Sequence, residues 1–190
     1  MLTKRSGLKT SLVGIALLAA AIAPSAALAE ERTCRGTLGA TAVDNLRVPQ
    51  NATCTLNGTF VKGTIKVQRN ATLVARGVRV VGNVQAENAA NVIVNRASRI
   101  GGSVQVKQGG GASVTGSRIT GDIQYDANRR RLTASGNRVG GNIQIVGNRG
   151  GAAIFRNVVV GNLQCKQNRP APSGGGNVVR GSKENQCARF

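Results

Sequence analysis

A repeat of about 20 residues constrains the fold of this chain more than any other feature. A short Gly-x-Ile/Val-Gln motif, or a close variant of it, recurs along the chain, and residues 51–65 ("NATCTLNGTFVKGTI") match residues 70–84 ("NATLVARGVRVVGNV") beyond that motif. The leading glycines stand 19 or 20 residues apart, at Gly63, Gly82, Gly102, Gly121, Gly141 and Gly161. Asp44 and Gly181 extend the spacing at the two ends. A fixed period of this length is typical of a solenoid, in which each repeat packs only on its neighbours.

Apolar and polar residues alternate within each unit, and helical periodicity is missing. The segment after the glycine, such as "NIQI" at 142–145, places two aliphatic side chains on one face and polar ones on the other. A second segment has inward positions at Cys54, Leu73, Ile93, Ala112, Leu132 and Ala152, and again two residues later at Leu56, Ala75, Val114, Ala134 and Ile154. A third ends on Val61, Val80, Ile100, Ile119, Val139, Val159 and Val179. Three short strands per unit predict an all-β, single-domain parallel β-helix of about seven coils over residues 44–180.

Two sets of residues mark the corners between these strands. Asparagine and glycine tolerate the left-handed backbone that a sharp corner requires. One predicted corner contains Asn51, Asn70, Asn128, Asn148 and Asn168, and another contains Gly58, Gly77, Gly116, Gly136 and Gly176. We expect the repeated glycine before the first strand to form a corner as well.

On this pattern the chain resembles the right-handed parallel β-helix group, which includes pectin-lyase-like enzymes and the polymer-forming bactofilins. It is most similar to small exported bacterial β-helix proteins with no assigned activity. The resemblance covers about residues 43–181 and rests on the Gly-x-Ile/Val-Gln motif, which specifies fold much better than function. Right-handed winding is expected because the strict hexapeptide spacing of the left-handed type is missing.

Residues 1–29 have the features of a secretory signal peptide. Lys4, Arg5 and Lys9 precede an apolar run, and small residues ending at Ala29 form a cleavage site. These three are among the 26 basic residues, and none of the seven acidic residues lies in this segment, so the remaining chain has a net charge of +16. A secreted, periplasmic or cell-surface bacterial protein without a membrane span after cleavage is expected. Its charge suits a polyanion partner or serves solubility alone.

Four cysteines in an exported chain predict two disulfides, with three possible connectivities. We favour Cys34–Cys54 and Cys165–Cys187, since each bond would staple one end of the coil. An N-terminal cap at 30–43 and a C-terminal cap at 181–190 would then protect the ends, which favours a monomer. No metal site or cofactor is expected, because the chain has no histidine and no closely spaced cysteine pair.

Two outward columns of polar residues run along the predicted first face. The longer side chains include an amide column, Gln85, Gln105, Gln124, Gln144 and Gln164. The shorter side chains are Asn45, Thr64, Asn83, Ser103, Asp122, Asn142 and Asn162. Stacked amides favour a stabilising ladder. A flat array that binds sugar hydroxyls is the alternative, and an ice-binding lattice is a weaker one.

Arginines recur three residues before the motif glycine on the third face, at Arg79, Arg99, Arg118 and Arg138. Stacked about 5 Å apart, their guanidinium groups would repel one another unless anions lie between them. Such a row suits phosphate, sulfate or carboxylate groups along a polyanion, as does a basic corner at Arg129, Arg130 and Arg131. A merely solubilising surface is the alternative.

Catalysis is disfavoured, since β-helix lyases and hydrolases require clustered carboxylates and a basic catalyst. The closest acidic pair between the two ends, Asp122 and Asp126, occupies an outward slot and a corner. No catalytic residue is therefore assigned. The sequence favours a non-enzymatic structural or binding module that contacts an acidic polysaccharide or other polyanion through the arginine column and the amide face. The alternatives are a self-assembling structural surface protein with no small ligand and, third, a polysaccharide-active enzyme.

Overall fold

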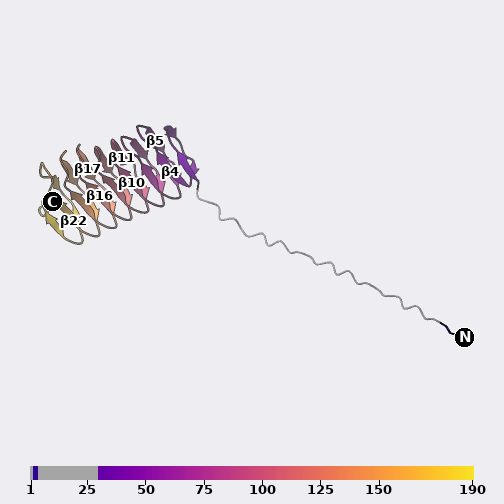
Figure 1. Ribbon diagram of the computed structural model, residues 1–190. Helices are drawn as coiled ribbons and strands as arrows, with labels where there is room; N and C mark the ends of the chain where they lie inside the picture. Colours follow the sequence, from indigo (N-terminus) through magenta and orange to yellow (C-terminus); the bar gives the residue numbers. More distant parts are fainter. Residues whose placement is uncertain (1, 4–29) are drawn as a thin grey trace.

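The computed structural model describes residues 2–3 and 30–190, and residues 31–185 wind into a parallel β-helix (Figure 1). The expected signal peptide lies outside the described residues, apart from Leu2 and Thr3. The strands form three parallel sheets of nine, eight and eight members, which gives about eight turns. One turn more than expected is present because residues 31–43, expected to be a cap, contribute strands β1, β2 and β3. The handedness of winding stays a prediction.

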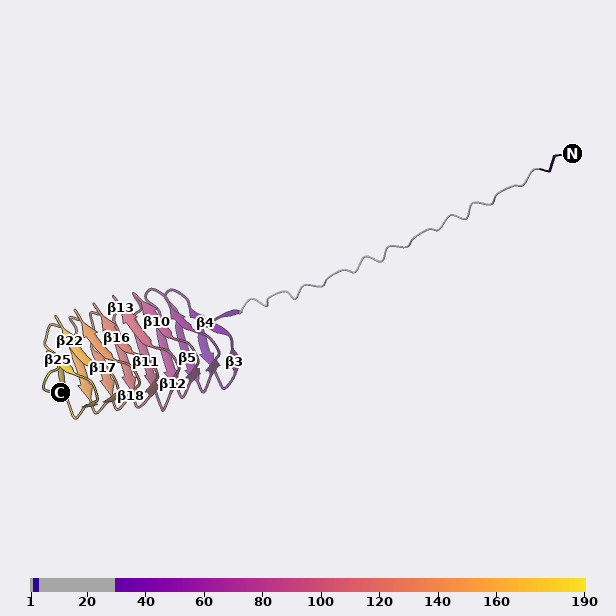
Figure 2. The same ribbon diagram turned by 90° about the horizontal axis from the view of Figure 1, so that it is seen from below.

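The first sheet carries the motif segments, and its strands follow one another along the axis of the rod (Figure 2). Each strand pairs only with its equivalents one coil before and after. Its members are β1 (Glu31–Thr33), β4 (Asn45–Val48), β7 (Ile65–Val67), β10 (Val84–Glu87), β13 (Val104–Lys107), β16 (Ile123–Asp126), β19 (Ile143–Val146), β22 (Leu163–Lys166) and β25 (Lys183–Asn185).

The other two sheets follow the same order. The second contains β2 (Gly36–Leu38), β5 (Thr53–Asn57), β8 (Thr72–Arg76), β11 (Asn91–Asn95), β14 (Gly111–Thr115), β17 (Leu132–Ser135), β20 (Ala152–Phe155) and β23 (Ser173–Gly175). The third contains β3 (Ala42–Val43), β6 (Phe60–Val61), β9 (Arg79–Val80), β12 (Arg99–Ile100), β15 (Arg118–Ile119), β18 (Arg138–Val139), β21 (Val158–Val159) and β24 (Val178–Val179).

The core is a stack of aliphatic side chains enclosed by the three sheets. The inward positions predicted for the first and third segments are confirmed as buried, although Val179 at the C-terminal end is only half-buried. One prediction for the second segment is wrong. Val92 and Val94 are buried, and Ile93 between them points outward, because Val92 pairs in register with Leu73 only 19 residues earlier.

The glycine corner is confirmed, and the asparagine corner is partly wrong. All five predicted corner glycines, Asn51 and Asn70 have positive φ. In the later coils the left-handed residues are instead Ala127, Gly147 and Gln167, one position before each asparagine. The asparagines that follow them, Asn128, Asn148 and Asn168, are buried. Their sequence spacing thus reflects an interior role rather than backbone conformation.

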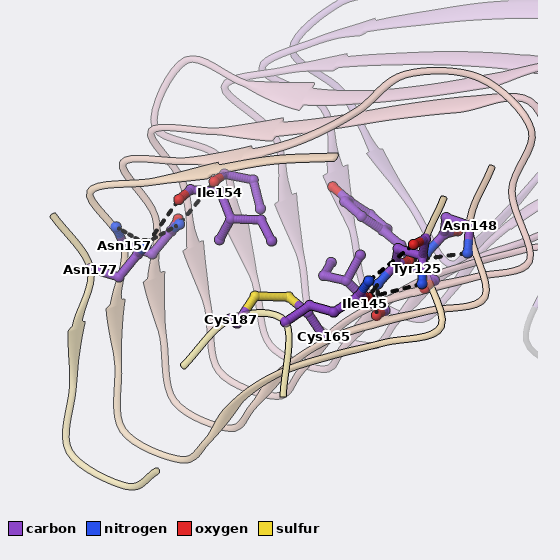
Figure 3. The surroundings of a disulfide bond; sticks show 11 residues. Tyr125, Ile145, Asn148, Ile154, Asn157, Cys165, Asn177 and Cys187 are labelled. Carbon is purple, nitrogen blue, oxygen red and sulfur yellow. Dashed lines mark hydrogen bonds between the residues drawn. A yellow bond between two sulfur atoms is a disulfide. The ribbon is translucent and has the colours of Figure 1, made fainter. Parts of the chain in front are cut away.

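These buried asparagines form one of two inner amide ladders, the first being Asn128–Asn148–Asn168–Gln186 and the second Asn137–Asn157–Asn177. Asn148 shows the pattern: its Nδ2 donates to Asn168 Oδ1 and to the Tyr125 carbonyl, both at 2.9 Å. Its Oδ1 accepts the backbone N–H of Asn128 at 2.8 Å. The two ladders lie at different corners, on either side of the C-terminal disulfide (Figure 3). They satisfy corner backbone groups that the sheets leave unpaired.

The repeated motif glycine is not a left-handed corner, which corrects our expectation. None of the seven glycines of this column has positive φ. A Cβ at each one would instead collide with the side-chain oxygen of the short polar residue one coil earlier, as at Gly141 and Asp122. That oxygen accepts a backbone N–H from the next coil, for example from Asn142 to Asp122 Oδ1 at 2.6 Å. Glycine is therefore required because only it leaves room for this bond.

Both predicted disulfides are present. Cys34–Cys54 joins the first two coils, and Cys165–Cys187 joins strand β22 to the C-terminal turn (Figure 3). Phe190 lies against Gly174, so the last residues cover part of the end of the second sheet. Two structural disulfides are typical of an oxidising, extracellular compartment. In the described part of the chain, no helix is long and apolar enough to cross a membrane.

Candidate functional site

The structure brings the four predicted arginines into one column on the third sheet. Arg79, Arg99, Arg118 and Arg138 are direct partners on the neighbouring strands β9, β12, β15 and β18. Each strand is only two residues long, with the arginine exposed and the following aliphatic residue buried. The core residue therefore fixes the outward direction of its arginine. With neighbouring strands about 4.8 Å apart, the four side chains begin along a line of about 14 Å.

The electrostatics of this arginine column are uncompensated. In the part of the chain that the structure describes, the ion pairs are Arg47–Glu31 and Lys62–Asp44, and neither includes a column arginine. Phe60, which pairs in register with Arg79, places its ring 5.3 Å from the Arg79 guanidinium carbon. This cation–π contact orients the first arginine without neutralising it.

A hollow of about 430 Å³ lies beside the arginine column at its C-terminal half. Arg99, Arg118 and Arg138 line it, and so does Arg156, which our sequence analysis missed. Arg156 is exposed and has a φ of 53°, at the corner where other coils have glycine. An arginine in that glycine column was the signal that could have identified it. The hollow is therefore lined by four arginines from four successive coils.

The basic corner of Arg129, Arg130 and Arg131 is a different place. Arg129 and Arg130 line a second hollow with Arg69, at the turn between the first and second sheets. Arg131 lines yet another depression, next to Gly150. None of the three lines the hollow of the arginine column. The structure thus divides the predicted polyanion-binding residues between separate surfaces.

The predicted amide column is aligned but only partly hydrogen-bonded. Gln85, Gln105, Gln124, Gln144 and Gln164 are in-register partners on the first sheet. Among these described glutamines, Gln105 and Gln124 are the pair joined side chain to side chain, at 3.2 Å. The outer column of short residues is bonded throughout, because each oxygen accepts a backbone N–H from the next coil. Gln124 also donates to Asp122 and Gln164 to Glu184, whereas Gln85 and Gln144 make no side-chain hydrogen bond within the described chain.

The amide column and the arginine column lie on different sheets, the first and the third. None of the five glutamines lines the hollow of the arginine column. Gln85 and Gln105 line a separate hollow on the first sheet instead. The two columns therefore line different hollows, and their joint use as one contact surface stays a prediction.

The carboxylates that a polysaccharide-active enzyme would need are engaged or dispersed. Asp122 Oδ1 accepts the backbone and side-chain N–H groups of Asn142, and its Oδ2 accepts from Gln124. Asp126 is exposed at the end of its strand. Within residues 2–3 and 30–190, no three His, Cys, Asp or Glu side chains gather into a group able to hold a metal ion.

Among the described residues, two titratable groups have shifted pKa values, and both lie outside the arginine column. Lys62, 2.9 Å away, lowers the pKa of Asp44 through their hydrogen bond and charge attraction. Burial raises the pKa of Tyr125, whose hydroxyl donates to the Thr133 carbonyl in the core. Neither group is placed for acid–base chemistry on a ligand at the column.

Comparison with known proteins adds no family to this geometry. The chain matches no family model, no curated protein and no solved structure. The resemblance to the pectin-lyase-like and bactofilin-like group is therefore supported only as a parallel β-solenoid fold.

Proposed function

We propose that this protein is an exported, non-enzymatic β-solenoid that binds a polyanion, such as an acidic polysaccharide, along the arginine column. The observation that carries the proposal is the register of four exposed arginines on four adjacent strands with no acidic partner. A rigid scaffold holds these charges together at a cost in self-repulsion. A bound anion relieves that repulsion and gains affinity from it.

The chemistry of arginine suits a repeating anion. Its planar guanidinium donates two parallel hydrogen bonds to phosphate, sulfate or carboxylate oxygens. A chain running parallel to the solenoid axis would meet a new cation about every 4.8 Å. Each contact releases counterions, so binding should weaken steeply with salt.

A purely solubilising role explains the arginine column less well. Solubility rises with net charge and does not require that like charges share one column. The described chain has exposed positions in every coil, yet the arginines share one column over four coils. Self-assembly through the ends is also less favoured, because Phe190 and the Cys165–Cys187 turn cover part of the C-terminal end.

The test is binding of the purified chain from Glu30 onward to heparin, a sulfated polysaccharide, across a salt series. The test variant changes Arg79, Arg99, Arg118 and Arg138 to Ser. We expect the slope of log K against log salt to flatten by roughly three, because each lost anion contact removes about 0.7–0.9 from it.

The matched control changes four dispersed exposed cations to Ser: Arg32, Arg35, Lys166 and Arg189. Both variants lose the same net charge, so a nonspecific charge effect would weaken them equally. Equal slopes in the two variants would contradict the proposal. No binding by the unchanged protein at physiological salt would also contradict it and leave the charge as a solubility device.

A further inference from the structure

The hollow lined by Gln85 and Gln105 lies on the first sheet in the N-terminal half and is larger than the one beside the arginine column. Its volume is about 660 Å³, within the range of sites that hold small ligands. The residues on which the argument rests are Lys66, Gln68, Arg69, Gln85, Gln105 and Lys107, and we call them the amide groove. It shares no lining residue with the hollow of the arginine column.

Strands β7, β10 and β13 form the floor of the amide groove, and a turn forms one wall. Strand β7 ends at Val67, whereas β10 continues to Glu87, so the chain leaves the sheet earlier in that coil. The turn is closed by a bond from the Ala71 N–H to the Gln68 carbonyl at 3.1 Å. It is tied to the preceding coil by the Gln50 N–H, which donates to Gln68 Oε1 at 3.2 Å. These two hydrogen bonds therefore fix the turn that presents Arg69.

The groove mixes cations, amides and one acid, unlike the arginine column. Lys66, Arg69 and Lys107 are exposed, and none of them belongs to either ion pair of the described residues. Gln85 and Gln105 stand in register with Lys66 on adjacent strands, and Lys107 follows two residues after Gln105 on the same strand. Glu87 lies in register with Lys107 and adds the one carboxylate of the groove, which accepts hydrogen bonds. The net charge of these side chains is modestly positive.

This composition fits a ligand with a few separated negative charges and many hydroxyl groups. Lysine and arginine bind carboxylates, while glutamine amides both donate to and accept from hydroxyls. Glu87 accepts a bond from a sugar hydroxyl but repels a densely charged chain. None of the groove's lining residues, all within the described chain, is aromatic. The groove therefore has no side chain on which a nucleic-acid base could stack.

We propose that the amide groove is a second binding site, which takes a short acidic oligosaccharide whose carboxylates alternate with neutral sugars. This inference is independent of polyanion binding at the arginine column, since it uses another face and other residues. An adjacent hollow shares Arg69 and Asn88 and adds Arg129 and Arg130. A longer saccharide would therefore continue from the groove onto the basic corner.

The test is calorimetric titration with a hyaluronan tetrasaccharide, in which glucuronate alternates with N-acetylglucosamine. Fully N-acetylated chitotetraose, a neutral tetrasaccharide, tests the need for carboxylate, and a thymidine oligonucleotide tests nucleic acid. We expect the tetrasaccharide to bind and the other two to bind at least tenfold more weakly. The Lys66→Ser/Arg69→Ser variant should lose at least tenfold in affinity, roughly the loss of one charge-assisted hydrogen bond. The Gln85→Ala/Gln105→Ala variant should lose severalfold.

The four-serine variant of the arginine column is the matched control. It removes more positive charge than the Lys66→Ser/Arg69→Ser variant, but on another face. It should therefore bind the tetrasaccharide within about threefold of the unchanged protein. Loss in that variant with retention in the groove variants would overturn the second site. Equal binding of chitotetraose, or tighter binding of the oligonucleotide, would overturn the assigned ligand class. Thermal unfolding of each variant shows whether it is folded, and chemical-shift mapping of bound tetrasaccharide locates the site without any substitution.

Discussion

The inner amide ladders and the outward glutamine column are made of the same functional group on the same repeat, and they behave differently. Asn148 and Asn157 are buried, and each side-chain amide bonds to both a neighbouring rung and a carbonyl of another coil. Gln85 and Gln144 also repeat every 19 or 20 residues, but on a solvent-facing strand position. Enclosure, and not residue chemistry, separates the two.

The difference teaches where this fold keeps free binding capacity. A buried amide must be satisfied by the protein, because an unpaired polar group inside costs more than a bond gains. An outward amide has water as its partner and exchanges it for a ligand at little cost. The arginines of the column also face solvent, so they too can exchange water for a ligand, and they bind through charge instead of an amide.

Breaking one inner rung should have the largest effect. Asn148→Leu leaves the Asn128 N–H and the Tyr125 carbonyl without the partners they now have. We expect the free energy of unfolding to fall by about 3–5 kcal/mol, as for several buried groups left unsatisfied. Urea denaturation measures it. The control Gln144→Leu, four residues away on the outward face, should change it by less than about 1 kcal/mol, and a similar loss in both would contradict the distinction.

The motif glycine offers the next largest effect. Gly141→Ala places a Cβ against Asp122 Oδ1, and overpacking of this kind costs about 1–3 kcal/mol. If the clash is with that oxygen, the cost should shrink in an Asp122→Ala background. A double-mutant cycle by thermal unfolding measures the coupling. Additive effects would show that Gly141 is required for another reason.

Tyr125→Phe tests a single buried hydrogen bond. The hydroxyl donates to the Thr133 carbonyl at 2.9 Å, and its loss should cost about 1 kcal/mol. Burial raises the pKa of Tyr125 above its ordinary value of 10, so the folded chain holds this proton more tightly than the unfolded chain. The resulting stability is fully present below pH 10 and falls as pH rises above it.

The chain has one tyrosine and no tryptophan, so the ultraviolet absorbance of ionised phenol reports Tyr125 alone. We expect ionisation to coincide with alkaline unfolding rather than precede it. The phenylalanine variant should lack that part of the alkaline destabilisation. Ionisation at pH 10 with the fold intact would show that the hydroxyl is not enclosed.

The smallest effect is expected at the exposed pair Asp44–Lys62. Lys62 lowers the pKa of Asp44, so the pair contributes stability above the ordinary carboxyl value of 3.8 and loses it as pH falls through the folded value. Lys62→Ala should therefore raise the Asp44 pKa, with little change in thermal unfolding at neutral pH. Carbon NMR of the carboxyl group measures it, and an unchanged pKa would show that the ion pair does not persist in solution.

The sequence predicted most of the fold because the repeat places every core position in register. Its errors have two physical sources. Coils of 19 and 20 residues shift the alignment, which turned Ile93 inward in the prediction and outward in the structure. Asparagine also serves two purposes, so Asn51 and Asn148 share a spacing while one bends the backbone and the other bonds within the core.

The candidate sites were predicted only in part. Register alone placed Arg79 through Arg138 in one column. The hollows depend on where strands end and turns project, and that separated Arg129 from the arginine column and placed Arg156 in the hollow beside it. Such features follow from the three-dimensional path of each turn, which one-dimensional spacing does not contain.

The most direct single test is nitrogen-detected NMR of the side chains during titration with a heparin hexasaccharide. It observes the Nε–H groups of the arginines and the Nδ2–H groups of the inner ladders in one spectrum. We predict that the signals of Arg79, Arg99, Arg118 and Arg138 shift with ligand, while those of Asn148 and Asn157 stay unchanged. Shifts confined to Arg129, Arg130 and Arg131, or shifts of the ladder amides without the arginine column, would contradict this assignment.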